Sequence, residues 1–309
     1  MNTKKLMTMA GLLLGASVYS YSQQALEPGT YFIQNAVTGT YLSAGANWGT
    51  RCVLAKHGVD FKVEKNGDAY TLVTDLQGAG KALRPSDAYM DQSGTWTITP
   101  HADGTYSLFN GTNYLGYVAD NAHNWVPRID TYTSDEDEST HWRFLTKDDL
   151  AKTLDKATAD NPVDATFYIS APEFLIGDER IKTAKVWGND VTGTGGNVDG
   201  ASTLLNCSNG EVFNKSTFNV TQTLTDIPNG IYTLRVQGFY RYGSNTNAAA
   251  AYNNKTDKKS AILYANDCST PLPVVYDEAK RGSEGGWNYN TAAGYVPNDQ
   301  AAAAAWSLG

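Results

Sequence analysis

Three short loops in the first half of the chain each combine an aromatic side chain with amide or carboxylate groups. They contain Asn47 and Trp48, then Asp87 and Tyr89, then Asp120, Asn124 and Trp125. A sugar ring stacks its apolar face on an aromatic ring while fixed polar groups bind its hydroxyls, so this combination predicts carbohydrate binding. The structural alternative is that the aromatic residues cap a barrel and the polar residues only form turns.

The second half of the chain contains further residues of the same kinds. They are Trp187, Asn189, Gln237, Arg241, Trp287 and Tyr289. The aromatic residues lie at loop edges near amides, whereas Gln237 and Arg241 share one face of an expected strand. One interpretation is a second cleft that binds a ligand. The other is a set of scattered surface aromatics beside a solvated charged face.

No pattern of catalytic residues stands out. The sequence has no Gly-x-Ser-x-Gly turn, and its four histidines form neither a His-Glu-x-x-His pair nor a zinc-type spacing with cysteine. The 32 acidic residues permit the two carboxylates of a glycosidase but do not argue for them. The acidic run 135–138 is interpreted as a solvated turn with weak potential for calcium. We therefore predict no catalytic residue, no metal ligand and no enzyme activity.

The first three loops recur within a threefold repeat that must position them. Each copy opens on a Gly and a Tyr in an alternating strand, continues through a leucine, and closes on an aromatic residue. The repeated residues are Tyr31, Tyr70 and Tyr106, then Leu42, Leu83 and Leu115, and finally Phe61, Trp96 and Trp142. Three strand-rich units of about 40 residues favour a closed, pseudo-threefold β-barrel over 29–146, with the closing aromatics in its core.

The character of the sequence changes after residue 146. Thr146 and Asp149 have the spacing of a capping box, so 147–163 is predicted to be a linker that begins with a helix over 147–158. Strands are expected at 165–169, 217–224, 230–242, 260–265 and 272–276, with loops at 188–202, 243–258 and 277–299. Residues 164–309 are thus predicted to form an antiparallel, jelly-roll-like β-sandwich that is C-terminally incomplete, and the fold class is all-β.

Residues 1–22 have the features of a secretory signal peptide. Lys4 and Lys5 precede an apolar stretch from Leu6 to Val18, and small residues follow as far as Ser22. The alternative is a buried N-terminal helix. The protein is therefore expected to be secreted, periplasmic or held at the cell surface. No lipid anchor is expected, because no cysteine lies at the cleavage point, and no membrane insertion is expected.

The charge of the chain bears on its partners. The formal net charge is −8, and the lysines and arginines are scattered rather than clustered. Nucleic-acid binding depends on clustered basic residues that neutralise phosphates, so this class of partner is disfavoured. An acidic surface suits a neutral ligand, which agrees with the sugar-binding interpretation of the loops.

The three cysteines are Cys52, Cys207 and Cys268, so at most one internal disulfide can form. Cys207 with Cys268 is the preferred pair because both lie in the second half of the chain, although the sequence does not separate the three pairings. Burial of all three thiols as small hydrophobic side chains is the alternative.

Through the Gly-x-Tyr strands and the aromatic-x-apolar repeat ends, residues 29–146 resemble the ricin-type β-trefoil lectins. The motif of that family has Gln two residues before each closing aromatic, where this chain has Val59, Gly94 and Thr140. The resemblance implies a β-trefoil with sugar-binding loops. Fascin-like and other non-lectin trefoils share the same fold.

Through the stretch 218–224, the turn 228–230 and the strand 232–241, residues 164–309 resemble the galactose-binding-like β-sandwich of bacterial carbohydrate-binding modules. Such modules usually bind glycans, and some hold a structural calcium; no other cofactor is expected. The two resemblances imply a secreted, non-catalytic protein that binds a glycan or polysaccharide, or the binding portion of a larger glycan-degrading protein. The alternative is a surface structural or protein-interaction protein that uses the same domains as scaffolds.

Overall fold

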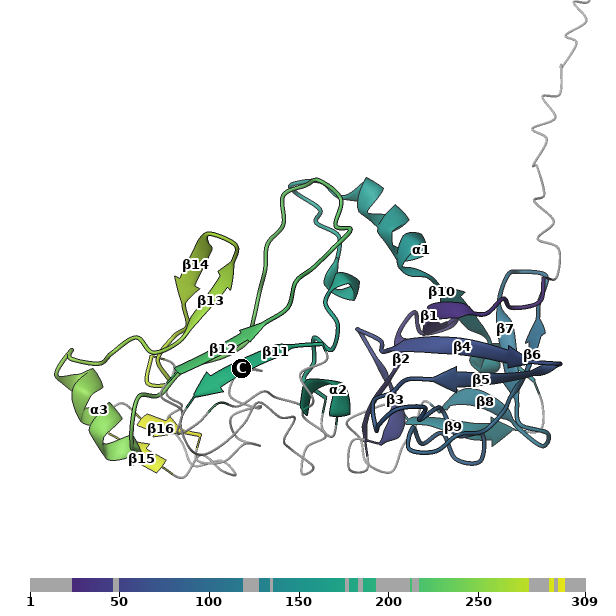
Figure 1. The fold of residues 1–309 in the computed structure, drawn as a ribbon, viewed down its shortest axis with the longest axis horizontal. Helices are drawn as coiled ribbons and strands as arrows, with labels where there is room; N and C mark the ends of the chain where they lie inside the picture. The colour runs from purple at the N-terminus through teal and green to yellow at the C-terminus, as the bar shows by residue number, and fades with distance from the viewer. Residues whose placement is uncertain are drawn as a thin grey trace, which may run out of the picture.

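Strands dominate the computed structural model, and the helices are few and short (Figure 1). The structure describes residues 24–46, 50–118, 128–133, 136–175, 178–182, 186–192, 212, 217–277, 289–291 and 294–297. None of the helices in these ranges is long and apolar enough to cross a membrane. The prediction of an all-β fold class is therefore confirmed for the described part of the chain.

Ten strands in the first half form one sheet that closes on itself. They are β1 (Gly29–Asn35), β2 (Tyr41–Ala46), β3 (Arg51–Ala55), β4 (Asp60–Asn66), β5 (Ala69–Val73), β6 (Thr97–Pro100), β7 (Tyr106–Phe109), β8 (Tyr114–Val118), β9 (Arg128–Thr133) and β10 (Trp142–Leu145). Antiparallel pairs join β1 to β4, β4 to β5, β6 to β7, β7 to β10, and β10 back to β1. A bridge between Tyr70 in β5 and Trp96, just before β6, completes a six-stranded barrel.

Each third of the barrel carries a hairpin, and the hairpins pair with one another. β2 pairs with β3 and β8 pairs with β9, while Ala82 bridges Gln92 at the corresponding place in the second repeat. β3 in turn pairs with β9, and Arg51 in β3 bridges Tyr89. A six-stranded barrel with a hairpin or an equivalent bridge in each of three repeats is a β-trefoil, so the predicted pseudo-threefold barrel is confirmed.

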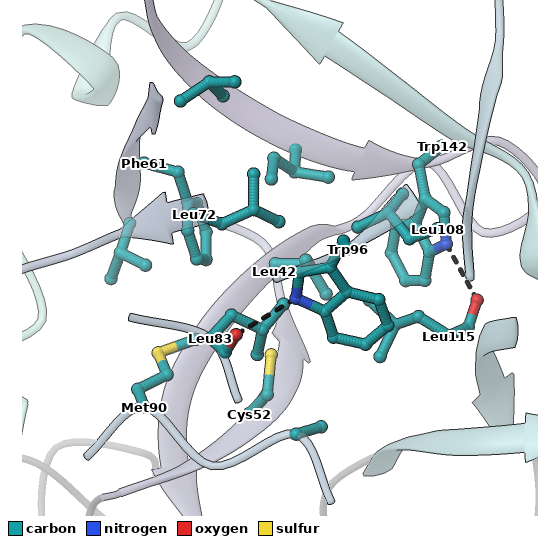
Figure 2. Close-up of a cluster of buried hydrophobic side chains, with 14 of the residues drawn as sticks. Leu42, Cys52, Phe61, Leu72, Leu83, Met90, Trp96, Leu108, Leu115 and Trp142 are labelled. Atoms are coloured by element: carbon teal, nitrogen blue, oxygen red, sulfur yellow. Dashed lines mark hydrogen bonds between the residues drawn. The ribbon is translucent and has the colours of Figure 1, made fainter. Parts of the chain in front are cut away.

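The residues that repeat in the sequence build the core of the barrel. Leu42, Leu83, Leu115, Phe61, Trp96 and Trp142 are all fully buried (Figure 2). In the second repeat the indole Nε1 of Trp96 donates a hydrogen bond of 3.0 Å to the carbonyl oxygen of Leu83. In the third repeat Trp142 donates to Leu115 at the same distance. The closing tryptophan therefore both fills the core and satisfies a buried backbone carbonyl in its own repeat.

In the first repeat the carbonyl oxygen of the leucine is also hydrogen-bonded, but its donor is not an indole. Phe61 has no donor, and the carbonyl oxygen of Leu42 instead accepts a hydrogen bond of 3.1 Å from the backbone N–H of Val59. Val59 is buried and lies two residues before Phe61, at the position of a glutamine in the ricin-type motif. An apolar side chain at this position packs in the core.

The other two positions of that motif also have structural roles here. A Cβ atom on Gly94 would lie 2.2 Å from Cδ of Pro85, so no side chain fits at this position. Thr140 is buried, and its hydroxyl donates a hydrogen bond of 2.7 Å to the carbonyl oxygen of Asp137 at the start of helix η1 (Glu138–Thr140). The missing glutamines are thus explained by packing and by a helix cap.

A short helical linker follows the barrel. Helix α1 (Lys147–Ala151) begins after Thr146, whose hydroxyl accepts a hydrogen bond of 3.1 Å from the backbone N–H of Asp149. The Asp149 carboxylate accepts in return from the backbone N–H of Thr146, which completes the capping box. The 3-10 helix η2 (Lys152–Lys156) continues from α1. The structure therefore contains the predicted helix as a shorter α-helix and a 3-10 extension.

The strand predicted at 165–169 is wrong, because this segment forms the 3-10 helix η3 (Thr166–Tyr168). The Asp164 carboxylate accepts a hydrogen bond of 2.9 Å from the backbone N–H of Thr166, and such local bonds compete with strand pairing. Helix α2 (Glu179–Lys182) follows, and the backbone N–H of Glu179 donates to the carbonyl oxygen of Leu76 in the trefoil. The segment after the linker therefore packs against the barrel.

The remaining strands form three separate antiparallel pairs. They are β11 (Gly188–Thr192) with β12 (Thr217–Thr221), β13 (Ile262–Ala265) with β14 (Cys268–Pro271), and β15 (Tyr289–Thr291) with β16 (Gly294–Val296). The strands predicted at 217–224 and 260–265 are thus present in shorter form. Within the described ranges these pairs are not joined into a larger sheet, and the β-sandwich stays a prediction.

Further expectations for the second half are wrong. The predicted loops 188–202 and 277–299 contain β11 and the β15–β16 pair, respectively. The segments 230–242 and 272–276 are not strands, and an isolated bridge between Tyr240 and Val274 links them. The loop predicted over 243–258 contains helix α3 (Asn245–Asn253), which Ser244 caps by accepting a hydrogen bond from the backbone N–H of Asn247. A run of four alanines, the residue with the highest helix propensity, explains this helix.

The cysteines do not form the preferred disulfide. Cys268 is a free, exposed thiol, so the predicted pairing with Cys207 is wrong; Cys207 itself lies outside the described residues. Cys52 is free and completely buried in the trefoil core, and this burial raises the pKa of its thiol. Cys52 therefore matches the alternative of a small buried hydrophobic side chain.

Candidate functional site

The loop of the second repeat holds a carboxylate in a fixed position. Arg84 donates from Nε and Nη2 to the two carboxylate oxygens of Asp87, each at 2.6 Å. Ala88 adopts a left-handed conformation with φ of 60°, and the chain returns so that the N–H of Arg84 donates to the carbonyl oxygen of Tyr89. The turn and the two-pronged ion pair together preorganise Asp87, which remains partly exposed.

The aromatic residue of the same loop lies beside two arginines. The guanidinium carbons of Arg51 and Arg84 are each 5.3 Å from the centre of the Tyr89 ring, within the range of a cation–π interaction. Arg51 is buried and belongs to β3 of the first repeat, so the loop is fixed to its neighbouring hairpin. The loop therefore gathers an aromatic ring, a carboxylate and two cations.

Asp91 adds a second carboxylate to this group. Its Oδ1 atom lies 3.7 Å from Nη1 of Arg84, and this buried oxygen has no hydrogen-bond partner among the residues that the structure describes. We call Arg51, Arg84, Asp87, Tyr89 and Asp91 the Arg84 patch. It offers acceptors and donors around an aromatic ring, which is the chemistry that a polyhydroxylated ligand requires.

The sequence pattern predicts two residues of this patch, Asp87 and Tyr89. The structure brings them together with Arg51, Arg84 and Asp91, which the pattern does not indicate. Arg84 lies three residues before Asp87, and this spacing of opposite charges was a local signal. Arg51 comes from another repeat, so only the pairing of the hairpins could reveal it.

The other candidates of the trefoil lie outside the described residues. They are Asn47 and Trp48 in the first repeat and Asp120, Asn124 and Trp125 in the third. The hairpins that flank these loops, β2–β3 and β8–β9, are described and paired. Each of these loops therefore follows the second strand of its repeat, as predicted.

The ligand-binding residues predicted in the second half lie in different parts of the structure. Trp187 stacks on Phe174 with 5.3 Å between ring centres and donates a hydrogen bond to the carbonyl oxygen of Ala171, which indicates a packing role. Gln237 and Arg241 are exposed on the extended segment after β12. Asn189 lies in β11 and Tyr289 in β15, and Trp287 is outside the described residues. The described contacts do not assemble these residues into one cleft.

A separate hollow in the second half is lined by aromatic and charged side chains. It is open, measures about 510 Å³ and lies beside α3, where Tyr240, Tyr252, Lys255 and Asp257 contribute to its wall. The Tyr240 hydroxyl donates a hydrogen bond of 3.0 Å to Asp257. Burial and then this hydrogen bond raise the pKa of Tyr240 to about 12. The hollow thus combines aromatic rings with fixed charges, and the sequence patterns did not indicate it.

Charged residues join the trefoil to the segment after the linker. His57 contacts two carboxylates of that segment, with Nδ1 2.6 Å from Glu173 and Nε2 3.0 Å from Asp164. The hydrogen bond to Glu173 raises the pKa of His57 most, and burial opposes this shift. Burial acts to raise the pKa of Asp164, but hydrogen bonds from Thr166, Lys56 and His57 outweigh it and lower that pKa.

We expect the contact through His57 to weaken as the pH rises. Because the folded pKa of His57 is raised, its stabilisation is complete below the unfolded value of 6.5 and is lost as the pH passes the folded value. The loss should be about 1 kcal/mol or less, since Asp164 and Glu173 are partly exposed. Hydrogen exchange of residues 164–175 at pH 5.5 and 8.5 measures it. His57→Gln should remove the difference, and an unchanged difference in that variant would contradict the assignment.

Of the known proteins compared with this chain, only solved structures are similar to it. The chain matches no protein-family model and no curated protein sequence. The ricin B-like lectin of Macrolepiota procera, solved in complex with lactose, is 15% identical, covers 40% of this chain and 98% of its own, and gives a TM-score of 0.33. The agglutinin of Rhizoctonia solani is 18% identical over 40% of this chain and 99% of its own, with a TM-score of 0.31.

A salivary protein of a Culex mosquito is similar to the same extent. It is 14% identical over 40% of this chain and 96% of its own, with a TM-score of 0.31. All of these likenesses are weak, and the proteins come from different biological settings. The pairing of the ten strands, rather than these likenesses, identifies the β-trefoil of this chain.

Proposed function

We propose that this protein is a secreted, non-catalytic carbohydrate-binding protein, or the binding portion of a larger glycan-degrading protein, and that its trefoil loops hold the sites. The Arg84 patch is the observation that supports the proposal. It places the aromatic ring of Tyr89 and the preorganised carboxylate of Asp87 on the predicted loop of the second repeat. In the sequence, Trp48 and Trp125 occur in the corresponding loops of the other two repeats.

Binding would combine stacking on an aromatic ring with hydrogen bonds to sugar hydroxyls. A carboxylate has about four lone-pair sites, and Arg84 occupies two of those on Asp87, so the group can still accept a hydrogen bond from a hydroxyl. Guanidinium groups can donate to ring and hydroxyl oxygens. Each site would be shallow and weak, and several sites on one chain would gain affinity through avidity.

Variants of the Arg84 patch test the proposal. We expect Asp87→Asn to weaken the binding of a glycan at the second repeat about tenfold, since a hydrogen bond to a charged group contributes about 1.5–3 kcal/mol. Tyr89→Ala should weaken it by about the same factor, because it removes the ring on which the sugar would stack. Titration of tryptophan fluorescence with a glycan retained by the wild type measures this change. Trp48→Ala and Trp125→Ala report on the other two repeats.

Tyr232→Ala is a matched control for this series, because Tyr232 is an exposed tyrosine outside the trefoil. Its affinity should equal that of the wild type. Circular dichroism establishes that each variant is folded before binding is compared. Wild-type affinity in Tyr89→Ala, Asp87→Asn, Trp48→Ala and Trp125→Ala would show that the trefoil loops are not the site.

One observation favours a protein-interaction role as the second candidate. Large apolar side chains are exposed along the second half, including Ile231, Leu234, Val236 and Tyr242 on the extended segment. Contiguous exposed apolar surface often marks a site where another protein binds. A folded sample that binds no glycan but retains a defined protein partner, and loses it in Val236→Asp, would support this candidate over the first.

A further inference from the structure

Two histidines and a glutamate converge at the junction of the second and third repeats. His101 directly follows β6, Glu136 precedes helix η1, and His141 directly precedes β10. No motif in the sequence links them, because His101 lies far along the chain from both Glu136 and His141. The fold alone brings these three side chains together.

The three ligand-type atoms lie close to one another. Oε1 of Glu136 is 2.9 Å from Nε2 of His101 and 3.8 Å from Nε2 of His141. The two imidazole rings stack with 4.3 Å between their centres and 18° between their planes. Tetrahedral zinc with bonds of about 2.0–2.2 Å to nitrogen and oxygen holds its ligand atoms about 3.3–3.5 Å apart. The observed distances bracket this value.

The present arrangement leaves one of these atoms unsatisfied. Nε2 of His101 is buried and makes no hydrogen bond with any residue in the described part of the chain, although Glu136 is within 2.9 Å. The distance is short, but the direction is unsuitable for a hydrogen bond to the carboxylate. A cation between the two groups would satisfy the nitrogen and the oxygen at once.

The backbone at each of the three positions is anchored. The N–H of His101 donates to the carbonyl oxygen of Thr105, which closes the turn between β6 and β7. Asp137, the residue after Glu136, caps helix η1 with a reciprocal capping box. The carbonyl oxygen of His141 accepts a hydrogen bond of 2.9 Å from the N–H of Ala36 in the first repeat. Rotation of the side chains alone would therefore adjust the cluster.

We propose that His101, Glu136 and His141 bind a divalent late transition metal, with Zn²⁺ as the preferred ion. Two imidazoles and a carboxylate suit zinc far better than calcium or magnesium, which prefer oxygen ligands. The stacked rings must turn about their Cβ–Cγ bonds so that both Nε2 lone pairs point at the ion. Glu136 is exposed, so water completes the fourth position.

The site would join the second repeat to the third. His101 belongs to the turn after β6, whereas Glu136 and His141 flank the helix before β10. A metal that binds the folded protein and not the unfolded chain raises stability with its concentration. The proposal is independent of carbohydrate binding, because the cluster includes none of the residues of the Arg84 patch.

The test is isothermal titration of the full chain, freed of metal with EDTA, with ZnCl₂ alone. We expect one Zn²⁺ per chain, a raised melting temperature, and a Kd at least about tenfold weaker in His101→Asn and in His141→Asn. Glu136→Gln should also weaken binding. Co²⁺ in place of Zn²⁺ should give the visible absorption of a four-coordinate site in the wild type. This absorption should be absent from His101→Asn and from His141→Asn.

His57→Asn and Cys268→Ser are the matched controls, since they remove an imidazole and an exposed thiol elsewhere in the chain. Both should bind Zn²⁺ as the wild type does. Circular dichroism without metal shows whether His101→Asn and His141→Asn are folded. The proposal is overturned if the folded wild type binds no Zn²⁺ saturably, or if both histidine variants keep wild-type affinity.

Discussion

Replacing Trp96 with alanine will lower the free energy of unfolding of the trefoil by about 3–5 kcal/mol. The side chain is 1% exposed and lies in the middle of the barrel core (Figure 2). Its removal opens a large cavity, and the carbonyl oxygen of Leu83 loses the indole N–H that it accepts from. Urea denaturation of the full chain, followed by circular dichroism, measures the change.

Two further variants separate the causes of this loss. Trp96→Phe keeps most of the volume but removes the donor, so it should cost less, about 1–3 kcal/mol. Trp187→Ala removes a tryptophan outside the barrel core and should leave the unfolding of the trefoil unchanged. A stability of Trp96→Ala within about 1 kcal/mol of the wild type would contradict the place of this residue in the core.

Replacing Asp178 with alanine will detach the segment after the linker from the trefoil, at a cost of about 3 kcal/mol. The Asp178 side chain is fully buried, and its oxygens accept hydrogen bonds from Nε and Nη2 of Arg180 at 3.1 and 2.9 Å. Arg180 in turn donates at 3.0 Å to Asp60 in β4 of the trefoil. Removal of Asp178 leaves a buried guanidinium with one remaining carboxylate, which is strongly unfavourable.

Hydrogen exchange and limited proteolysis of the full chain measure this detachment. Exchange should rise at α2 and at the N–H of Glu179, which donates to Leu76, while the barrel stays protected. The double variant Asp178→Ala, Arg180→Met removes both charges and should recover much of the loss, because no unpaired charge stays buried. Equal exchange in Asp178→Ala and the wild type would mean that the ion pair does not hold this segment.

The barrel could be predicted from the sequence because its signals repeat. The tyrosines, leucines and closing aromatics occur in three copies, and each copy buries the same positions in one core. The capping box at Thr146 is equally local, so the start of α1 is predictable. A pattern that recurs at a fixed period is stronger evidence for a fold than a single segment, because every copy must fit the same structure.

The errors in the second half arise where local and long-range signals disagree. The segment 230–242 alternates as a strand does, but a strand also needs a partner, and in the described ranges Val274 supplies a single bridge to Tyr240. At 165–169 the side chain of Asp164 bonds to the backbone of Thr166 and favours a turn. Alternation of residue types contains no information about either effect.

The sequence predicts only part of the candidate site, because some of its contacts join segments that are far apart in the chain. Asp87 and Tyr89 lie two residues apart on one turn, so their composition reveals them. Arg51 reaches the ring of Tyr89 through the pairing of two hairpins, and the zinc-type cluster of His101, Glu136 and His141 forms through the contact of two repeats. Such contacts follow from the closed barrel and not from spacing in the sequence.

We propose that the trefoil loops bind a carbohydrate. A glycan array probed with the folded full chain, and in parallel with Tyr89→Ala, Trp48→Ala and Trp125→Ala, is the decisive experiment. We predict a saturable signal for at least one glycan in the wild type and a loss of that signal in at least one loop variant, with Tyr232→Ala unchanged. An array without signal from a folded sample, or a signal that all three loop variants retain, would contradict the claim.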